Sequence, residues 1–275
     1  MGILKKILIA SIVVFIVTSY IVLEFIFLEP KTVFFNVGQG SSVGIFSKKV
    51  TILYDVGNSR SIINKIAKNL PFWKKTIDFL IISHKDKDHY GAIYDVLQNY
   101  KVRFLVVGEW NPDGAFENSL TKFLKNTKVL IIKKGTTIKT PNEFFTFLTD
   151  ARGKKEDNEK SLVVKFSQKE TFWGFPILRK FLLMGDFPIK LEKEIENFDL
   201  SSDILLVAHH GSKYNTSLNF IEKVKPQIAV IQVGPNNYGH PHKEVIEILQ
   251  KGNVKILRTD RDGTIIISGR GFKKL

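Results

Sequence analysis

The sequence predicts an α/β fold, an αββα sandwich preceded by one N-terminal transmembrane helix. Strand-like apolar runs and helix-like segments recur in both halves of the 275 residues without a detectable repeat. This pattern is typical of two packed sheets with helices outside them. An uncharged apolar stretch precedes the first predicted strand. We therefore expect a membrane anchor or signal segment over residues 1–30 and one large domain over residues 31–275.

The apolar stretch at residues 7–23 carries no charge and follows Lys5 and Lys6. As a helix it would be about 25 Å long, just enough to span a bilayer. Basic residues before it and acidic residues after it favour a cytoplasmic N-terminus and an extracytoplasmic domain. Residues 17–19 are a poor cleavage site. Three alternatives remain: an uncleaved single-pass anchor in the cell membrane, a cleaved signal that releases a secreted domain, or a buried helix.

Twelve short apolar runs, bounded by turn residues and often rich in branched side chains, predict strands. They lie at 33–37, 43–46, 50–54, 77–82, 104–107, 129–132, 161–166, 181–184, 204–208, 228–233, 254–257 and 264–267. Apolar residues at helical spacing predict helices at 61–69, 90–99, 188–197, 217–224 and 242–250. The polar stretch 149–160 predicts an exposed loop.

The net charge of +14 is the clearest compositional clue to a partner. The basic and acidic residues of segment 1–30 are equal in number, so the whole positive charge lies on the main domain. This charge favours a polyanionic partner such as DNA. The lysines are spread along the chain, so a generally basic composition without a nucleic-acid role remains an alternative. The absence of cysteine excludes disulfides and thiolate ligands. Any metal must therefore be held by His, Asp or Glu.

The strongest functional signal is a cluster of two histidines and two aspartates between the predicted strand 77–82 and a predicted helix. His84, Asp86 and Asp88 alternate and can point the same way from an extended backbone, and His89 can turn in as the helix begins. Imidazole and carboxylate together suit Zn²⁺, and a larger oxygen share favours Mn²⁺ or Fe. A solvated turn with helix-capping aspartates is the alternative.

All six histidines fall in three short stretches, and each stretch follows a strand-like run. The other two pairs are His209 with His210 and His240 with His242. Open α/β sheets bind their ligands at the ends of strands. We therefore expect the three stretches to share one site, with His242 facing solvent at the start of a helix.

These motifs resemble those of a known family. The loop at 84–89 resembles the signature loop of the metallo-β-lactamase fold hydrolases, usually His-x-His-x-Asp-His, with Asp86 in place of the second histidine. Leu-Leu-Met-Gly-Asp at 182–186 and Val-Ala-His-His-Gly-Ser at 207–212 resemble its later ligand motifs. Together with Val-Gly-Gln-Gly at 37–40 and Gly-His-Pro-His at 239–242, they are similar to the extracellular hydrolase domain of the ComEC family of DNA-uptake (competence) proteins.

The resemblance covers roughly residues 32–268 and implies two divalent metal ions, Zn or Mn, at adjacent sites. One ion would be held by His84, Asp86 and the bridging Asp186, and the other by Asp88, His89, Asp186 and His209. Asp86 makes the first site more anionic and favours Mn²⁺ or weaker binding. A metal-activated water would serve as the nucleophile.

The expected catalytic residues are Asp88, His210 and His240, and the two histidines would hold substrate oxygens or protonate a leaving group. The choice of His209 rather than His210 as the ligand remains open. The predicted substrate-binding residues are Asn158, Ser212, Lys213, Gly38, Gln39 and Gly40. An ordinary hairpin turn is the alternative for the three residues 38–40.

Two residues depart from the Asp-Val-Gly-Gln-Gly-Asp pattern of the ComEC-like proteins: Asn36 and Ser41 replace its carboxylates. Asp55 is expected to support a metal ligand or the fold rather than to react.

The resemblance implies a membrane-anchored phosphodiesterase or nuclease that acts on DNA outside the cytoplasmic membrane, beside a separate transmembrane channel protein. Hydrolysis of another phosphoester, a lactam, a thioester or a lactone is one alternative, because this fold hosts many chemistries. A catalytically degenerate DNA-binding module of an uptake system is the other, motivated by Asp86, Asn36 and Ser41.

Overall fold

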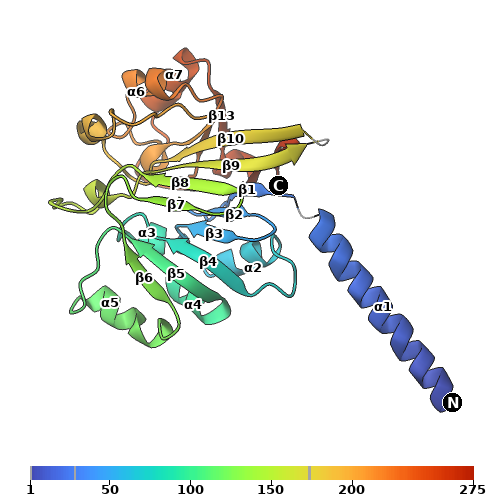
Figure 1. Ribbon diagram of the computed structural model, residues 1–275. Coiled ribbons are helices and arrows are strands. Elements are labelled where there is room, and N and C mark those ends of the chain that lie inside the picture. Colours follow the sequence, from blue (N-terminus) through green and yellow to red (C-terminus); the bar gives the residue numbers. More distant parts are fainter. Residues whose placement is uncertain (1, 28, 173–174) are drawn as a thin grey trace.

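The computed structural model describes residues 2–27, 29–172 and 175–275. Two sheets pack face to face, and helices cover both outer faces (Figure 1). The predicted αββα sandwich is confirmed.

The first sheet has the order β15-β14-β1-β2-β3-β4-β5-β6. It is antiparallel from β15 to β3 and parallel from β3 to β6. Its strands are β1 (Lys31–Phe34), β2 (Val43–Phe46), β3 (Thr51–Tyr54), β4 (Thr76–Ile81), β5 (Lys101–Val107), β6 (Lys128–Ile131), β14 (Ile265–Ser268) and β15 (Gly271–Lys274).

The second sheet has the order β13-β12-β11-β10-β9-β8-β7. Its strands are β7 (Thr137–Lys139), β8 (Glu143–Phe147), β9 (Val164–Phe172), β10 (Phe175–Leu183), β11 (Ile204–Leu206), β12 (Ile228–Ile231) and β13 (Lys255–Arg258). β9 and β10 pair over nine residues, so the hairpin is longer than the predicted runs 161–166 and 181–184. The outer part of β9 is polar and the outer part of β10 is largely exposed, so no buried apolar run marks the described residues of this part of the hairpin.

Eight α-helices are described: α1 (Ile3–Phe27), α2 (Ile62–Ala67), α3 (Lys87–Tyr90), α4 (Ile93–Asn99), α5 (Ala115–Leu120), α6 (Leu218–Val224), α7 (Lys243–Lys251) and α8 (Thr259–Asp262). The predicted helix 90–99 is split between α3 and α4. Residues 189–194 form a 3₁₀ helix where an α-helix was expected. The predicted exposed loop 149–160 begins with three buried residues, because Thr149 Oγ1 donates to Ser161 O and accepts from Val163 N.

Three apolar clusters hold the layers together. The central cluster lies between the sheets and includes the stacked rings of Phe166 and Phe181, with centroids 4.4 Å apart. A second cluster joins β10 to β13 with α6 and α7, and a third joins β3 to β5 with α2 and α4. Fully burying one such side chain contributes about 1.5–3 kcal/mol.

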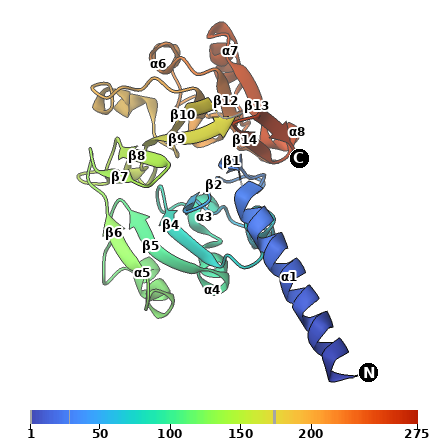
Figure 2. The same ribbon diagram turned by 45° about the vertical axis from the view of Figure 1, so that its right-hand side comes forward.

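Helix α1 projects from the domain, and Figure 2 shows it leaving the sandwich without packing along it. Its segment Ile3–Val22 is long and apolar enough to cross a membrane, and none of that segment is buried against the protein. A signal sequence has the same length and composition.

The carboxyl ends of β3, β4, β10, β11 and β12 meet at one edge of the sandwich. Tyr54 pairs with Ile81 in the first sheet, and Leu183 pairs with Leu206 in the second. Polar segments that follow these strands therefore converge at that edge, where α/β proteins commonly bind ligands.

Candidate metal centre

The candidate site forms where these strands end. His84 follows β4, Asp186 follows β10, and His209 and His210 follow β11. His89 lies within the short helix α3, directly after the loop that carries His84. Segments more than one hundred residues apart in the chain thus contribute to one site.

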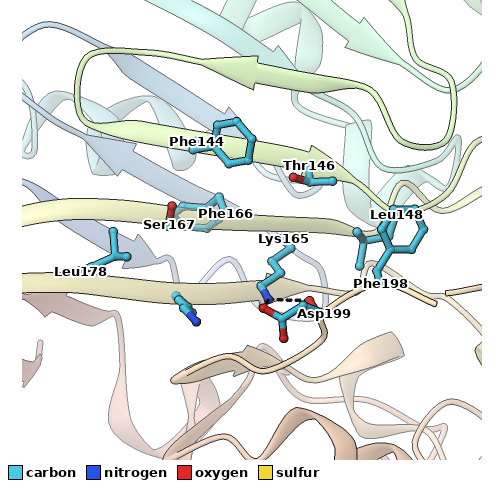
Figure 3. Close-up of a pocket in the computed structure, with 10 residues that line it drawn as sticks. Phe144, Thr146, Leu148, Lys165, Phe166, Ser167, Leu178, Phe198 and Asp199 are labelled. Atoms are coloured by element: carbon cyan, nitrogen blue, oxygen red, sulfur yellow. Dashed lines mark hydrogen bonds and ion pairs between the residues drawn. The ribbon is translucent and has the colours of Figure 1, made fainter. Parts of the chain in front are cut away.

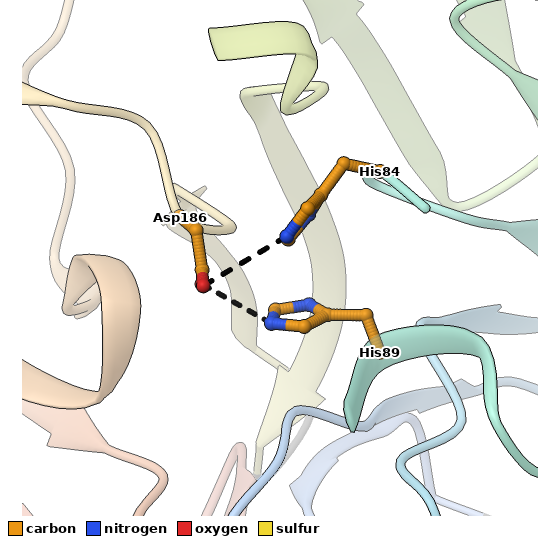
Figure 4. Close-up of side chains that lie close together, drawn as sticks. All are labelled: His84, His89 and Asp186. Carbon is orange, nitrogen blue, oxygen red and sulfur yellow. Dashed lines mark ion pairs between the residues drawn. The ribbon is translucent and has the colours of Figure 1, made fainter. Parts of the chain in front are cut away.

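The first group of side chains is His84, His89 and Asp186, all buried (Figure 4). Asp186 Oδ1 lies 3.1 Å from His89 Nε2, and Asp186 Oδ2 lies 3.8 Å from His84 Nε2. The two imidazole rings approach from the first sheet and the carboxylate from the second. The group therefore joins the two halves of the sandwich.

The second group is Asp88, His89 and His210. Asp88 Oδ2 lies 3.0 Å from His210 Nε2 and 3.9 Å from His89 Nε2. His210 Nδ1 donates to the backbone oxygen of Gln232 at 2.7 Å, which leaves Nε2 toward Asp88. His89 Nε2 belongs to both groups, and since one imidazole nitrogen binds one ion, it could serve either of two adjacent positions.

Hydrogen bonds fix the orientation of the first two rings. His89 Nδ1 lies 2.8 Å from Asp55 Oδ2. Ser83 Oγ donates to the same carboxylate oxygen at 2.8 Å and lies 2.9 Å from His84 Nδ1. Because Asp55 accepts the hydrogen bond from His89 Nδ1, Nε2 is the ring nitrogen that faces the centre. A carboxylate behind a histidine ligand is common in metal sites.

The buried donor atoms at the centre lack well-formed hydrogen bonds. His84 Nε2, His89 Nε2 and Asp186 Oδ1 are all buried, and they face charged groups at 3.1–3.8 Å without a hydrogen bond of good geometry. Buried polar atoms normally make well-formed hydrogen bonds, so three buried atoms that face one another without such bonds need an explanation. A divalent cation would satisfy all three. The residues present therefore fit a metal ion held by imidazole and carboxylate.

The electrostatics of the centre favour positive charge. Burial alone would lower the pKa of His89, but the carboxylates of Asp186 and Asp55 hold it well above its usual range. Burial alone would raise the pKa of Asp186, but the charges of His89, His210 and His84 hold it well below its usual range. The anionic groups that retain a proton on His89 would also attract a divalent cation.

Asp86 and His209 lie beside the first group. Asp86 Oδ2 is 3.3 Å from His84 Nε2, and its side chain is 41% exposed. His209 Nε2 is 3.5 Å from Asp186 Oδ2, and its Nδ1 is 3.5 Å from Asn158 Nδ2. The structure thus brings all six predicted metal ligands together and adds His210 beside them.

Backbone strain accompanies the two adjacent histidines. His209 and His210 have φ of 48° and 53°, in the left-handed region that non-glycine residues rarely adopt. Consecutive residues in this conformation turn both rings toward the centre from one short segment. Strained backbone of this kind concentrates at functional sites.

A cavity of about 510 Å³ opens beside His209. Asn158, Ser212 and Lys213 line it, so three of the predicted substrate-binding residues share one space. Lys213 Nζ lies 5.1 Å from the ring centroid of the exposed Tyr214. The cavity offers a cation and an aromatic face next to the candidate centre.

His240 lies at the outer side of the cluster. Its ring centroid is 5.4 Å from that of His209 and 6.5 Å from that of His210. Burial lowers its pKa, and its buried Nδ1 has no hydrogen-bond partner. His242 caps the N-terminus of α7 by accepting from Glu244 N.

The turn at residues 38–40 packs behind Asp88. Gln39 Oε1 accepts from Gly234 N at 3.2 Å, and Ser41 N donates to Asp88 O at 3.1 Å. A Cβ atom at Gly40 would lie 2.6 Å from that same carbonyl oxygen. This geometry gives the turn a supporting contact with Asp88, and the predicted contact with substrate stays a prediction.

Four residues that support the site were missed from the sequence: Ser83, Ser161, Asn215 and Gln232. Ser161 Oγ accepts from Asp186 N at 3.1 Å, and Asn215 Nδ2 donates to Asp186 O at 2.8 Å. Gln232 was placed inside a predicted strand, although a polar residue at the end of an apolar run is itself a signal. Ser161 and Asn215 carry no local signal, because only the tertiary fold brings them to Asp186.

Another cavity, of about 280 Å³, lies on the outer face of the second sheet (Figure 3). Apolar side chains such as Phe144 and Leu178 line it, and Lys165 Nζ bridges to Asp199 at 2.7 Å. None of the histidines or metal-site carboxylates borders it. Of these two cavities, only the one beside His209 adjoins the candidate metal centre.

Comparison with solved structures defines the class of fold. The metallo-β-lactamase fold protein YhfI from Bacillus subtilis superposes with a TM-score of 0.56 at 11% identity, over 86% of this chain and 100% of that one. Igni18, a metallo hydrolase from Ignicoccus hospitalis, superposes with a TM-score of 0.52 at 15% identity, over 86% and 98%. The protein therefore has the metallo-β-lactamase fold.

Sequence comparison narrows the resemblance. The chain is 29% identical to ComE operon protein 3 of Bacillus subtilis (strain 168) over 84% of this chain, and 28% identical to competence protein ComA of Neisseria gonorrhoeae over 90%. No family model matches. The chain spans about a third of the length of these two curated relatives. The predicted resemblance to the ComEC-type hydrolase domain is confirmed.

Proposed function

We propose that the chain is a metal-dependent phosphodiesterase or nuclease that cleaves DNA outside the cytoplasmic membrane. Residues 1–30 would anchor it as a single-pass protein, and residues 31–275 would form the hydrolase domain. The observation that carries the proposal is the buried convergence of His84 Nε2, His89 Nε2 and Asp186 Oδ1 without well-formed hydrogen bonds. Such an arrangement of imidazole and carboxylate suits a hydrolytic metal centre.

The proposed ligands keep the assignment that the family motifs imply. It differs from the two groups of side chains described above, because it gives His89 to one ion only and uses His209 rather than His210. His84, Asp86 and Asp186 would hold one ion, and Asp88, His89, Asp186 and His209 the other. Two divalent ions, Zn or Mn, would lower the pKa of a water molecule and neutralise charge on a phosphate. His210 lies close enough to Asp88 to replace His209 as a ligand.

The protein's own groups would orient the substrate. Lys213 and Ser212, in the cavity beside His209, would bind phosphate oxygens. His240 has its pKa lowered by burial, so at neutral pH it is largely uncharged and able to exchange a proton with the leaving group. Asp55 would keep the proton on His89 Nδ1, and Asp88 and His210 complete the proposed catalytic set.

DNA is the proposed substrate for two reasons. The net charge of +14 lies on residues 31–275 and attracts polyanions. The two curated relatives carry the names of a competence protein and a ComE operon protein. We further propose that a separate transmembrane channel protein carries out transport beside this domain.

The test is DNA cleavage by the full chain, purified without chelator and assayed for metal content by plasma mass spectrometry. We expect bound Zn or Mn, cleavage of single- or double-stranded DNA, loss of cleavage in EDTA and its return with added metal. Asp186→Asn should lower metal content and cleavage by about 100-fold or more. Asp199→Asn removes an exposed carboxylate that pairs with Lys165, and it should change neither.

Metal-replete protein that is inert on every phosphodiester would contradict the proposal. The same preparation should then be offered other phosphoesters, a lactam, a thioester and a lactone. Cleavage of one of these compounds would support a metal-dependent hydrolase but show that DNA is not its substrate.

A DNA-binding module without catalysis is the second candidate. It is favoured by Asp86, which stands where the family has a histidine and is partly exposed. It predicts salt-sensitive DNA binding that survives both chelation and Asp88→Ala. Binding lost on chelation would argue against it.

A further inference from the structure

One face of the domain lies at the opposite end of the strands from the metal centre. The strand register places it there: Lys31, which begins β1, pairs with Phe46 at the end of β2 and with Ser268 at the end of β14. Thr76, which begins β4, pairs with Lys101, which begins β5. We call residues 29–31, 47–50, 68–75, 99–101 and 269–270, with Phe175, the basal face.

The basal face exposes large aromatic side chains. Phe72 is 64% exposed, Trp73 is 37% exposed, and their rings meet edge to face with centroids 5.0 Å apart. Phe175 is 73% exposed at the start of β10. Leu183 ends β10 and lies beside the metal centre. Phe175 begins the same strand, so it lies at the opposite end of the domain. Aromatic rings are favoured where water meets the lipid headgroups.

The same face is strongly basic. Its loops hold eight Lys or Arg residues and one acid, Glu29, whereas the whole chain has 41 basic and 27 acidic residues. Glu29 is itself paired with Arg270 at 2.6 Å. The exposed basic side chains are those of Lys48, Lys49, Lys68, Lys75, Lys101 and Arg270. Basic groups beside aromatic groups suit an anionic lipid surface, where each contributes about 1 kcal/mol.

The chain holds this face close to the end of the apolar helix. Only three residues separate Phe27 at the end of α1 from Lys31 at the start of β1, so the two lie within about 14 Å even when fully extended. Both ribbon views show α1 joining the domain at the β1 end (Figures 1 and 2). If α1 spans the membrane, the basal face cannot be far from the lipid headgroups.

We propose that the basal face docks on an anionic lipid bilayer, with Phe72, Trp73 and Phe175 at the headgroup level and the metal centre turned away from the membrane. This inference rests on the proposed membrane anchor. Docking would hold the metal centre a full strand length above the lipid, open to a long polymer approaching from the aqueous side. The nuclease would thus cut strands in solution rather than at the bilayer surface.

The chain contains no cysteine, so single cysteines report cleanly on position. We would place them in the full chain as Ile12→Cys in α1, Phe72→Cys and Phe175→Cys on the basal face, and Tyr238→Cys near the metal centre. All four positions are exposed, and circular dichroism would verify folding. Each variant, labelled with an environment-sensitive fluorophore, would be reconstituted in vesicles of phosphatidylcholine and phosphatidylglycerol with spin-labelled acyl chains.

We expect labels at positions 12, 72 and 175 to lose most of their fluorescence to the lipid quencher, and the label at 238 to keep it. In pure phosphatidylcholine the labels at 72 and 175 should be quenched much less, while that at 12 is unchanged. If the label at position 12 is quenched but the labels at 72 and 175 keep their fluorescence as the label at 238 does, docking is overturned and the anchor stands. No quenching at 12 would overturn both. Equal quenching of 72 and 175 in the two lipid mixtures would overturn the charge-based recognition.

Discussion

Asp55 shows how one buried side chain can set the chemistry of a site that it does not enter. It is fully buried, with φ of 57°, and its carboxylate accepts from Ser83 N and Ser83 Oγ and contacts His89 Nδ1. By holding the Nδ1 proton of His89, it leaves Nε2 as the donor atom toward the metal. Its effect on metal binding is therefore predictable.

Asp55→Asn should weaken metal binding by about 10- to 100-fold, because an amide is a poorer acceptor for the His89 proton. Metal affinity by competition with a chromophoric chelator is the measurement. Asp78→Asn is the control: Asp78 is also buried and accepts from Thr51 N at 2.9 Å, but it lies near the other end of β4. Asp78→Asn should lower the stability of the protein and leave its metal affinity unchanged. If Asp55→Asn leaves metal affinity unchanged, Asp55 does not orient His89 for metal binding.

Gly40→Ala tests the contact between the 38–40 turn and Asp88. The new Cβ would lie 2.6 Å from Asp88 O, so the backbone that presents Asp88 must move. Gly38→Ala is the matched control, since its Cβ would meet nothing within 4 Å and only the positive φ of 79° is strained, at about 1–2 kcal/mol. We expect both to lower the melting temperature and only Gly40→Ala to lower metal content. Equal metal content would show that the turn does not position Asp88.

At the scale of elements, α5 is tied to the metal loop. Lys85, directly after His84, donates to Glu117 Oε1 at 2.6 Å, and Glu117 lies in the first turn of α5. Burial would raise the pKa of Glu117, but the hydrogen bonds from Lys85 and from Asn111 N lower it below its usual range. A lowered folded-state pKa means that this carboxylate stabilises the fold when ionised.

Glu117→Gln should therefore destabilise the protein most above the ordinary glutamate pKa, by about 1.5–3 kcal/mol at neutral pH. The difference from wild type should shrink as the pH falls below about 4, because the wild-type carboxylate then becomes protonated too. Denaturant unfolding at several pH values measures it. The exposed Glu222→Gln serves as control, and a pH-independent difference would contradict the role of charge.

The elements themselves were predictable to different degrees. Strands such as β2 and β3 are short, wholly buried runs, so their apolar sequence marks them well. β7 lies at a sheet edge, and the outer half of β10 is largely exposed. No buried apolar run marks either segment, and backbone pairing holds both in place. The 3₁₀ helix at residues 189–194 has no distinguishing pattern at all.

At the scale of the whole molecule, the segment Ile3–Val22 of α1 is not buried against the sandwich. Residues 31–275 alone should fold with a melting temperature within about 2 °C of the full chain, because Ile3–Val22 buries nothing against the domain. Without α1 they should no longer float with vesicles of pure phosphatidylcholine, which offer the basal face no anionic lipid. Circular dichroism and flotation would measure these outcomes. A large fall in melting temperature would mean that α1 supports the domain.

The sequence alone determined the αββα class, the apolar N-terminal helix and, through motifs that resemble a known family, the candidate ligands His84, Asp86, Asp88, His89, Asp186 and the later histidines. It could do so because strand periodicity and ligand spacing are local patterns. Only the tertiary structure decided that His209 lies by Asp186 while His210 lies by Asp88, that Asp55 orients His89, and that the aromatic groups gather opposite the metal centre. These features depend on strand register and on contacts between distant segments, which no local pattern encodes.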